Sequence, residues 1–238
     1  MSDSPALDSF LEKWRARWPE WSVAEIFVPV ERRERAVAWF ALLQEFEDAL
    51  NIAGDPLPAD AKLAWWSEEL RGWANQRSRH PLGRTLEPVR APWTRLADAL
   101  PILPAARAQA ADAEAAFAAL ATHADAVAAV EAVVLGRPVP AQAIAAQMLA
   151  GRLADVGPAV APVAVAQQAG QGEHALLRHW GRMLQQRWGS PRQGARERRI
   201  VGAYAQARLA RFIKAGEPST LPSQAALLFT GWRAARGD

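Results

Sequence analysis

The sequence contains no cysteine, and only one tyrosine and four histidines occur among its 238 residues. Without cysteine the chain can form neither disulfides nor thiolate metal sites, which suits the reducing cytoplasm. The histidines are His80, His123, His174 and His179. Only His174 and His179, five residues apart, approach the spacing of a zinc site, and no carboxylate pair lies beside them. We therefore expect a cytoplasmic protein without zinc.

A secretory leader and a long apolar run are also missing. The first residues, MSDSPALDSFLEKW, are acidic where a signal peptide needs a basic region and an apolar core. The best candidate for a membrane span, Ala154 to Gly170, contains Asp155, Pro158 and Pro162. It falls short of the about 20 apolar residues that a spanning helix needs. We expect a soluble protein with at most peripheral membrane contact.

Lysine is scarce, so arginine supplies most of the 28 cationic residues. The pI of 9.9 thus accompanies a net charge of only +3. Arginines gather between Arg192 and Arg199, which we interpret as the solvated start of a helix. An anionic membrane surface and nucleic acid are the alternative partners for this segment. Because no recognisable docking element accompanies the arginines, we expect no nucleic-acid partner.

No convincing alternating strand pattern is present, so the predicted fold class is all-α, with about eight helices. Half of the residues are apolar, which is enough for one large core, and we expect a single domain spanning residues 1–238. Proline and glycine separate the helical segments. The predicted helices lie before Pro19, at residues 36–53, around 63–73, from Pro81, and at 105–135, 141–155, 173–188, 195–215 and 222–236.

The first long helix carries one apolar stripe and an acidic cluster. Glu47 and Asn51 fall one turn apart on a line beside that stripe. The stripe consists of Val37, Phe40, Leu43, Phe46 and Leu50. Gly54 and Pro56 end this helix, and Asp60 is predicted to cap the next one.

Three segments in this region follow a known pattern. Glu47-Asp48-Ala-Leu-Asn51 stands where a DDxxD element is expected, Leu63-Ala-Trp65-Trp66-Ser-Glu-Glu69-Leu70 matches LxWWxxEL, and His80-Pro81-Leu82-Gly-Arg-Thr-Leu86 matches HPxxxAL. By these residues the chain resembles the squalene/phytoene synthase family, as a divergent member with degraded aspartate-rich motifs. The resemblance implies an isoprenoid-synthase helical bundle and substrates that are prenyl diphosphates.

The resemblance also implies a magnesium site, because carboxylates on two facing helices hold the ions that help diphosphate to leave. Glu47 and Asp48 fall on the leading aspartates of the first cluster, and Asn51 falls on the last. Asparagine keeps an oxygen ligand but loses the charge. Asp55 lies one more turn along the chain as a further candidate ligand. An ordinary solvated acidic helix face is the alternative interpretation.

The second cluster of the family, NxLRDVxED, is more strongly altered. Asp155 matches its first aspartate, but Pro158 and Ala159 replace the two acids that follow. A basic, tyrosine-containing segment normally comes next and contacts the diphosphate. Between Arg152 and Arg178 this chain has no lysine, arginine or tyrosine. We expect the cationic half of the site to be missing as well.

The tryptophans suggest either core packing or an aromatic wall. Trp39, Trp65, Trp66 and Trp73 lie at helical spacing, which favours the core. By resemblance, the helix of Trp39, Phe40 and Leu43 lines the family's cavity. We therefore predict a mainly apolar pocket that includes Phe40 or Leu43, with Glu47 and Asn51 at its mouth.

Three functions agree with these observations. The leading hypothesis is a divergent family member that has lost or reduced prenyl-diphosphate condensation and binds an isoprenoid or lipid ligand, or serves assembly through a protein partner. The first alternative is an active, magnesium-dependent prenyl transferase acting on farnesyl or geranylgeranyl diphosphate. The second is an arginine-rich helical interaction module without a ligand.

Overall fold

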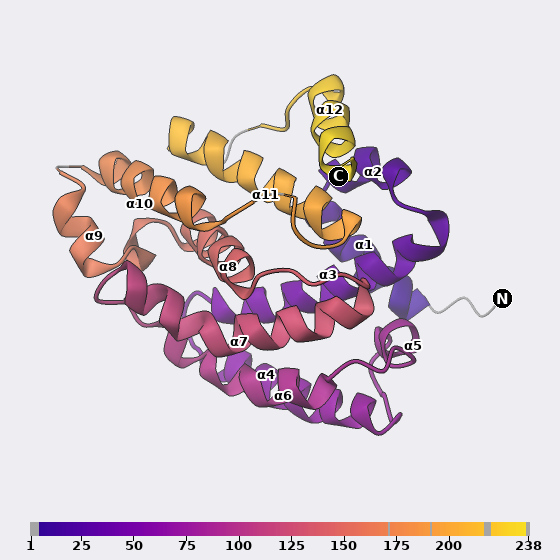
Figure 1. Cartoon of the computed structure of the whole chain (residues 1–238). Helices are drawn as coiled ribbons and strands as arrows, with labels where there is room; N and C mark the ends of the chain where they lie inside the picture. The colour runs from indigo at the N-terminus through magenta and orange to yellow at the C-terminus, as the bar shows by residue number, and fades with distance from the viewer. Residues whose placement is uncertain (1–4, 171, 191, 217–219, 237–238) are drawn as a thin grey trace.

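A computed structural model describes residues 5–170, 172–190, 192–216 and 220–236, and these residues form helices and connecting turns without any strand (Figure 1). The predicted all-α class is confirmed. The described residues contain twelve α-helices rather than about eight, because the proline-rich connections hold short ones. The α-helices are α1 Pro5–Arg17, α2 Glu20–Ala24, α3 Val30–Leu50, α4 Leu57–Ala74, α5 Gly83–Leu86, α6 Trp93–Ala99, α7 Ala113–Val134, α8 Ala141–Val156, α9 Val163–Gln168, α10 Glu173–Arg187, α11 Arg196–Ala215 and α12 Gln224–Ala235.

Four short 3-10 turns join these helices: η1 Glu25–Phe27, η2 Leu100–Ile102, η3 Ala105–Arg107 and η4 Pro158–Val160. One of them, η3, corrects the prediction of one helix over residues 105–135. The chain makes η3 first, and α7 begins only at Ala113. Asp112 caps α7, because its side chain accepts a hydrogen bond from the backbone N–H of Ala115 at 2.8 Å. An effective N-cap therefore places the start of α7, which alanine content alone did not predict.

Helix α3 runs through the middle of the molecule and has neighbours on several sides (Figure 1). Every residue from Ala36 to Phe46 is buried, and the predicted apolar stripe is in the core. Helices α1, α4 and α5 pack against it, and α7 makes further contacts. Because α3 is enclosed in this way, its polar residues also lie at contacts between helices.

Helix α4 confirms most of its predicted stripe. Trp66 and Trp73 are buried, but the side chain of Trp65 is 40% exposed and lies against the rings of Trp66 and His80. The prediction that Trp65 packs in the core is therefore wrong. Asp60 does not cap α4 either, since it lies inside the helix and pairs with Arg107 at 2.5 Å.

The segment around Arg192 to Arg199 is not a fully solvated helix start. Arg198 and Arg199 are each only 5% exposed. Arg198 forms an ion pair with Glu131 of α7, and Arg199 donates hydrogen bonds to the backbone carbonyls of Ala234 and Ala235. Carbonyls at a helix C-terminus lack partners within the helix, so Arg199 satisfies two of them in α12.

Helix α7 is the one helix of the described residues that is long and apolar enough to cross a membrane, judged by length and composition alone. This helix is not the segment from Ala154 to Gly170 that the sequence favoured. Alanine and valine make α7 apolar without a continuous run of large residues, so the sequence pattern did not single it out. Its buried side chains pack mainly on α8 and α6. The buried core helix of a soluble protein has the same length and composition.

Candidate functional site

A cavity of about 340 Å³ lies between α1, α3, α8 and α11. One part of its wall is apolar and the other is charged. The apolar part comprises Trp18, Ala150, Ala154, Trp188, Ala205, Leu209, Phe212 and Leu221, and the charged part comprises Arg17, Glu20, Glu47, Asp155, Arg208 and Arg211. Gln44, Gln147 and Gly151 complete the lining. The predicted meeting of the first long helix with the helix that ends near Asp155 occurs at this cavity.

Asp155 is held by an arginine from the N-terminal helix. The Nη2 of Arg17 donates to Oδ2 of Asp155 at 2.7 Å, and Nδ2 of Asn51 donates to the same oxygen at 3.2 Å. The Nη1 of Arg17 also lies 3.9 Å from Oδ1 of Asp48. One guanidinium therefore lies between carboxylates of α3 and α8. Two of the three carboxylates that the resemblance aligned with metal ligands already face this cation.

Lysines neutralise the rest of the acidic cluster on α3. Lys13 donates to Glu45 at 2.9 Å and lies 3.7 Å from Asp48, and Lys62 lies 2.6 Å from Glu45. Burial alone would raise the pKa of Glu45, but its hydrogen bonds to Lys62 and Lys13 hold that pKa below the usual value. Gln44 completes the arrangement by donating to Asp48 at 2.8 Å.

Glu47 differs from its neighbours, because no ion pair or hydrogen bond joins its carboxyl to another of the described residues. Burial, together with the nearby negative charge of Asp155, raises its pKa to about 7. Across the cavity, a Cβ added at Gly151 would lie 4.0 Å from Oε2 of Glu47, so glycine keeps this space open. Near neutral pH, Glu47 can offer a hydroxyl donor or an acceptor to a bound molecule.

Replacing Glu47 with glutamine should stabilise the protein at about pH 8 and change little at about pH 5. The pKa of Glu47 is higher in the folded state than in the unfolded state. The contribution of protonated Glu47 to stability is therefore complete below about pH 4.5 and is lost as the pH rises through about 7. Because the carboxyl faces a cavity, we expect about 1–2 kcal/mol rather than the full equivalent of the shift. Urea unfolding at both pH values measures the difference, with Glu12→Gln as an exposed control. An equal effect of Glu47→Gln at both pH values would contradict the assignment.

The cations of the cavity come from α1 and α11, so the expectation that the cationic half is missing is wrong. The Nε and Nη2 of Arg208 donate to the carboxylate of Glu20 at 2.8 and 2.5 Å. The guanidinium of Arg208 also lies 4.0 Å from the ring centre of Trp18. Arg211 follows one turn later, 3.9 Å from Glu20. The three-residue spacing of the two arginines was the available signal, since it places both on one helix face.

The other predicted site residues lie elsewhere. Asp55 is exposed, and its carboxylate accepts a hydrogen bond from the backbone N–H of Leu57 at the start of α4. Trp39 is buried and donates to Glu131 at 2.8 Å, and Phe40 packs against Trp14.

The main cavity is lined by Gln44 and Glu47 of α3, one helix face away from the predicted Phe40 and Leu43. Leu43 instead borders a small cavity of about 10 Å³ beside His123. Asn51 contacts Asp155 without lining the main cavity.

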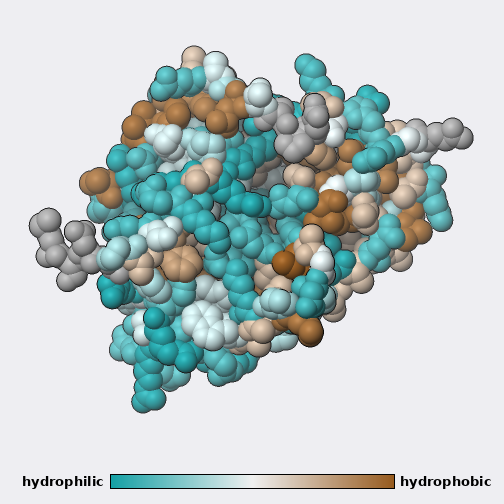
Figure 2. Space-filling model, turned by 180° about the vertical axis from the view of Figure 1, so that it is seen from behind, coloured by the Kyte–Doolittle hydropathy of each residue, from teal (hydrophilic) through white to brown (hydrophobic). Residues whose placement is uncertain are grey.

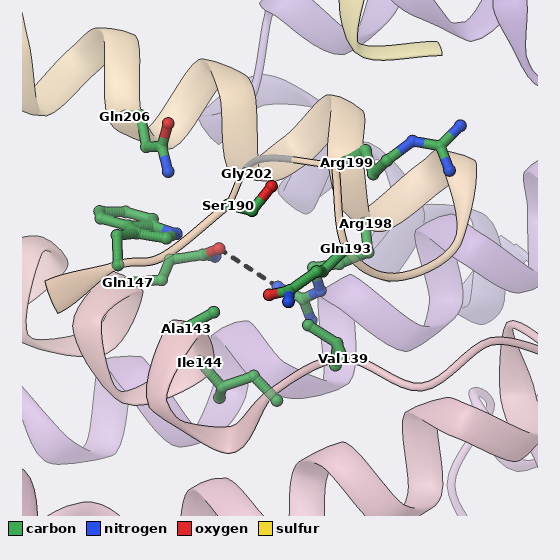
Figure 3. Close-up of a pocket in the computed structure, with 11 residues that line it drawn as sticks. Val139, Ala143, Ile144, Gln147, Ser190, Gln193, Arg198, Arg199, Gly202 and Gln206 are labelled. Atoms are coloured by element: carbon green, nitrogen blue, oxygen red, sulfur yellow. Dashed lines mark hydrogen bonds between the residues drawn. The ribbon is translucent and has the colours of Figure 1, made fainter. Parts of the chain in front are cut away.

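A small pocket of about 20 Å³ adjoins the site between α8 and α11 (Figure 3). There Arg198 donates to the side-chain oxygen of Gln147 at 3.2 Å, while Arg199 points away from the other labelled side chains (Figure 3). Gln147 also lines the main cavity and the cavity beside His123. Gln147 thus borders three spaces, and its side chain contacts the arginine that pairs with Glu131 of α7.

The carboxylates of the cavity do not fit a magnesium ion. Within the described part of the chain, no three histidine, aspartate or glutamate side chains are grouped so that they could hold a metal. Asp155 and Asp48 face Arg17, and Glu47 has a pKa near neutrality. Magnesium would need several hard oxygen ligands in near-octahedral geometry, and a cation already occupies the position between these carboxylates.

Comparisons with known proteins support the fold. No protein-family model and no curated protein matches the chain. Among solved structures, the fold is similar to that of a squalene synthase, HpnC from Alicyclobacillus acidocaldarius, with a TM-score of 0.52 and 18% sequence identity. The match covers 99% of this chain and 94% of that one. The chain therefore has a squalene synthase-like, all-helical fold, as the sequence motifs implied.

Proposed function

We propose that this protein binds a hydrophobic ligand of the isoprenoid or lipid class in the cavity between α1, α3, α8 and α11, and that it has lost magnesium-dependent prenyl-diphosphate condensation. The observation that carries the proposal is the position of Arg17 between Asp48 and Asp155. The resemblance places metal ligands at these two carboxylates. A guanidinium there neutralises both without offering a position for diphosphate oxygens to join a metal.

Displacing Arg17 would be costly for a metal ion. The 2.7 Å contact with Asp155 is a charge-assisted hydrogen bond, which is among the stronger polar contacts in proteins. A metal would have to break that contact and also keep Glu47 ionised in a site that raises its pKa. Both requirements oppose the binding of a metal ion. The charged wall of the cavity therefore favours the contacts within the protein over a bound metal.

The apolar wall supports a ligand with a hydrocarbon part. Its aromatic and aliphatic side chains come from α8, α11 and the connections after α1, after α10 and before α12. The volume of about 340 Å³ is in the range of small-molecule pockets, which combine apolar walls with a few polar groups. Glu47 and the arginines would contact the polar end of such a molecule, and the apolar wall would cover its chain.

Native mass spectrometry should detect a hydrophobic molecule that co-purifies with the wild-type protein, or farnesol after addition. In Gly151→Phe the ring would enter the cavity, because an added Cβ meets only Glu47 there, and ligand occupancy should fall at least about tenfold. Trp18 and Trp188 line the cavity, so tryptophan fluorescence gives a second measurement of farnesol binding.

The matched control is Gly202→Phe, which adds the same ring to a helix glycine with open space around it and outside the main cavity. It should keep wild-type occupancy. Absence of any bound molecule from the wild-type protein, with no fluorescence response to farnesol, would contradict the proposal. Equal loss of ligand in both variants would also count against this cavity.

A further inference from the structure

Helix α12 presents exposed aromatic side chains on the outer face of the molecule. The side chain of Phe229 is 59% exposed and that of Trp232 is 41% exposed, and their ring centres are 5.9 Å apart. Figure 2, which shows the molecule from behind, has hydrophobic residues along its upper edge, the part of the molecule where α2 and α12 lie in Figure 1. Large aromatic side chains that are exposed to solvent are typical of surfaces that contact another protein or a membrane.

Arginines lie on the same face of this helix. At about 100° per residue, Phe229, Trp232, Arg233 and Arg236 fall within an arc of about 100° on the side opposite the buried Leu227. Arg236 lies over the ring of Trp232, with its guanidinium carbon 4.6 Å from the ring centre. The exposed face of α12 therefore combines aromatic surface with positive charge.

This face borders a groove of about 600 Å³ between α11 and α12. Three exposed arginines, Arg192, Arg233 and Arg236, line the groove, and no carboxylate occurs among its lining residues. None of the three forms an ion pair with any residue in the described ranges. Phe229 and Trp232 also line the groove, and the rest of its lining is uncharged alanine, glutamine and threonine. The groove thus has positive charge without a neutralising partner in the described structure.

We propose that α12 docks the protein onto an anionic lipid surface, with Phe229 and Trp232 entering the headgroup region and the arginines binding lipid phosphates. Aromatic rings favour the boundary between water and hydrocarbon, and basic residues beside them add attraction to anionic lipids. Guanidinium groups bind phosphate through paired hydrogen bonds. The inference does not depend on the ligand proposal, although a bilayer would give a hydrophobic ligand a route to the protein.

The exposure of the two aromatic rings favours a lipid surface over an acidic protein partner. Phe229 and Trp232 line the groove but stay 59% and 41% exposed, so the described residues do not enclose either ring in a pocket. Protein interfaces bury their hot-spot residues in well-packed pockets. A fluid surface needs only shallow insertion of the rings and delocalised charge, and α12 supplies both.

Flotation of the full chain with phosphatidylcholine vesicles, with and without phosphatidylglycerol, tests the proposal. We expect binding only when the anionic lipid is present. Arg233→Gln/Arg236→Gln should weaken binding roughly 25-fold, since each basic residue near such a surface contributes roughly fivefold. Phe229→Ser/Trp232→Ser should weaken binding at least about tenfold while the charge stays the same.

Matched controls place the same changes elsewhere on the surface. Arg90→Gln/Arg95→Gln removes two exposed arginines near α6, and Leu57→Ser removes an exposed apolar side chain at the start of α4. Both should bind vesicles as the wild type does, and thermal unfolding verifies that all variants are folded. No binding of the wild type to anionic vesicles, or an equal loss in the controls, would overturn the proposal.

Discussion

Replacing Glu131 with alanine is expected to lower the free energy of unfolding by about 3–5 kcal/mol. The side chain of Glu131 is fully buried in α7, and it accepts hydrogen bonds from Nε of Arg198 at 2.8 and 3.0 Å and from Trp39 at 2.8 Å. Its removal leaves the charge of Arg198 without its carboxylate inside the protein. Because an unpaired buried charge is far costlier than a lost surface contact, the effect should exceed that of most substitutions. Urea unfolding followed by tryptophan fluorescence measures it.

Two further variants separate the buried charge from the loss of contacts in general. Glu114→Ala also removes a carboxylate of α7 that pairs with an arginine, but Glu114 is exposed, so we expect a far smaller change in the free energy of unfolding. Adding Arg198→Met to Glu131→Ala should recover part of the lost stability, because the unpaired charge is gone. If Glu114→Ala and Glu131→Ala had similar effects, the buried pair would not have the importance assigned to it.

Incubation of the purified protein with magnesium and farnesyl or geranylgeranyl diphosphate should yield no squalene or phytoene. Arg17 lies between Asp48 and Asp155, and Pro158 and Ala159 stand at the positions where the resemblance implies further acids. Without a metal ion to help diphosphate leave, the transition state loses several kcal/mol of stabilisation. We therefore expect no detectable activity. Mass spectrometry of organic extracts gives the measurement.

The same assay on Asp155→Ala identifies the origin of any product. A head-to-head product made by the wild type and absent from Asp155→Ala would contradict the prediction and support the active prenyl transferase. A product of equal amount in both would come from a contaminating enzyme. Arg17→Met gives a complementary test, since it frees Asp155 and should raise the affinity for magnesium.

The features that could be predicted from the sequence are those that depend on residues close together along the chain. Helix periodicity and proline punctuation gave the all-α class and the buried stripe of α3, and the Trp66 and His80-Pro81 motifs pointed to the squalene synthase-like fold. The two acidic helices could be paired only through the resemblance. Short helices and capped starts were missed, because a few residues carry little periodicity and a cap such as Asp112 acts through one hydrogen bond.

The character of the site was decided by tertiary structure. Arg17 and Asp155 are 138 positions apart, and Arg208 and Glu20 are 188 apart, so no local pattern joins them. The same is true of Arg198, whose place in an arginine-rich run suggested solvent until α7 supplied Glu131. Which residues are charged follows from the sequence. Which charges meet depends on how the helices pack, because ion pairs act over a few ångströms of space and not along the chain.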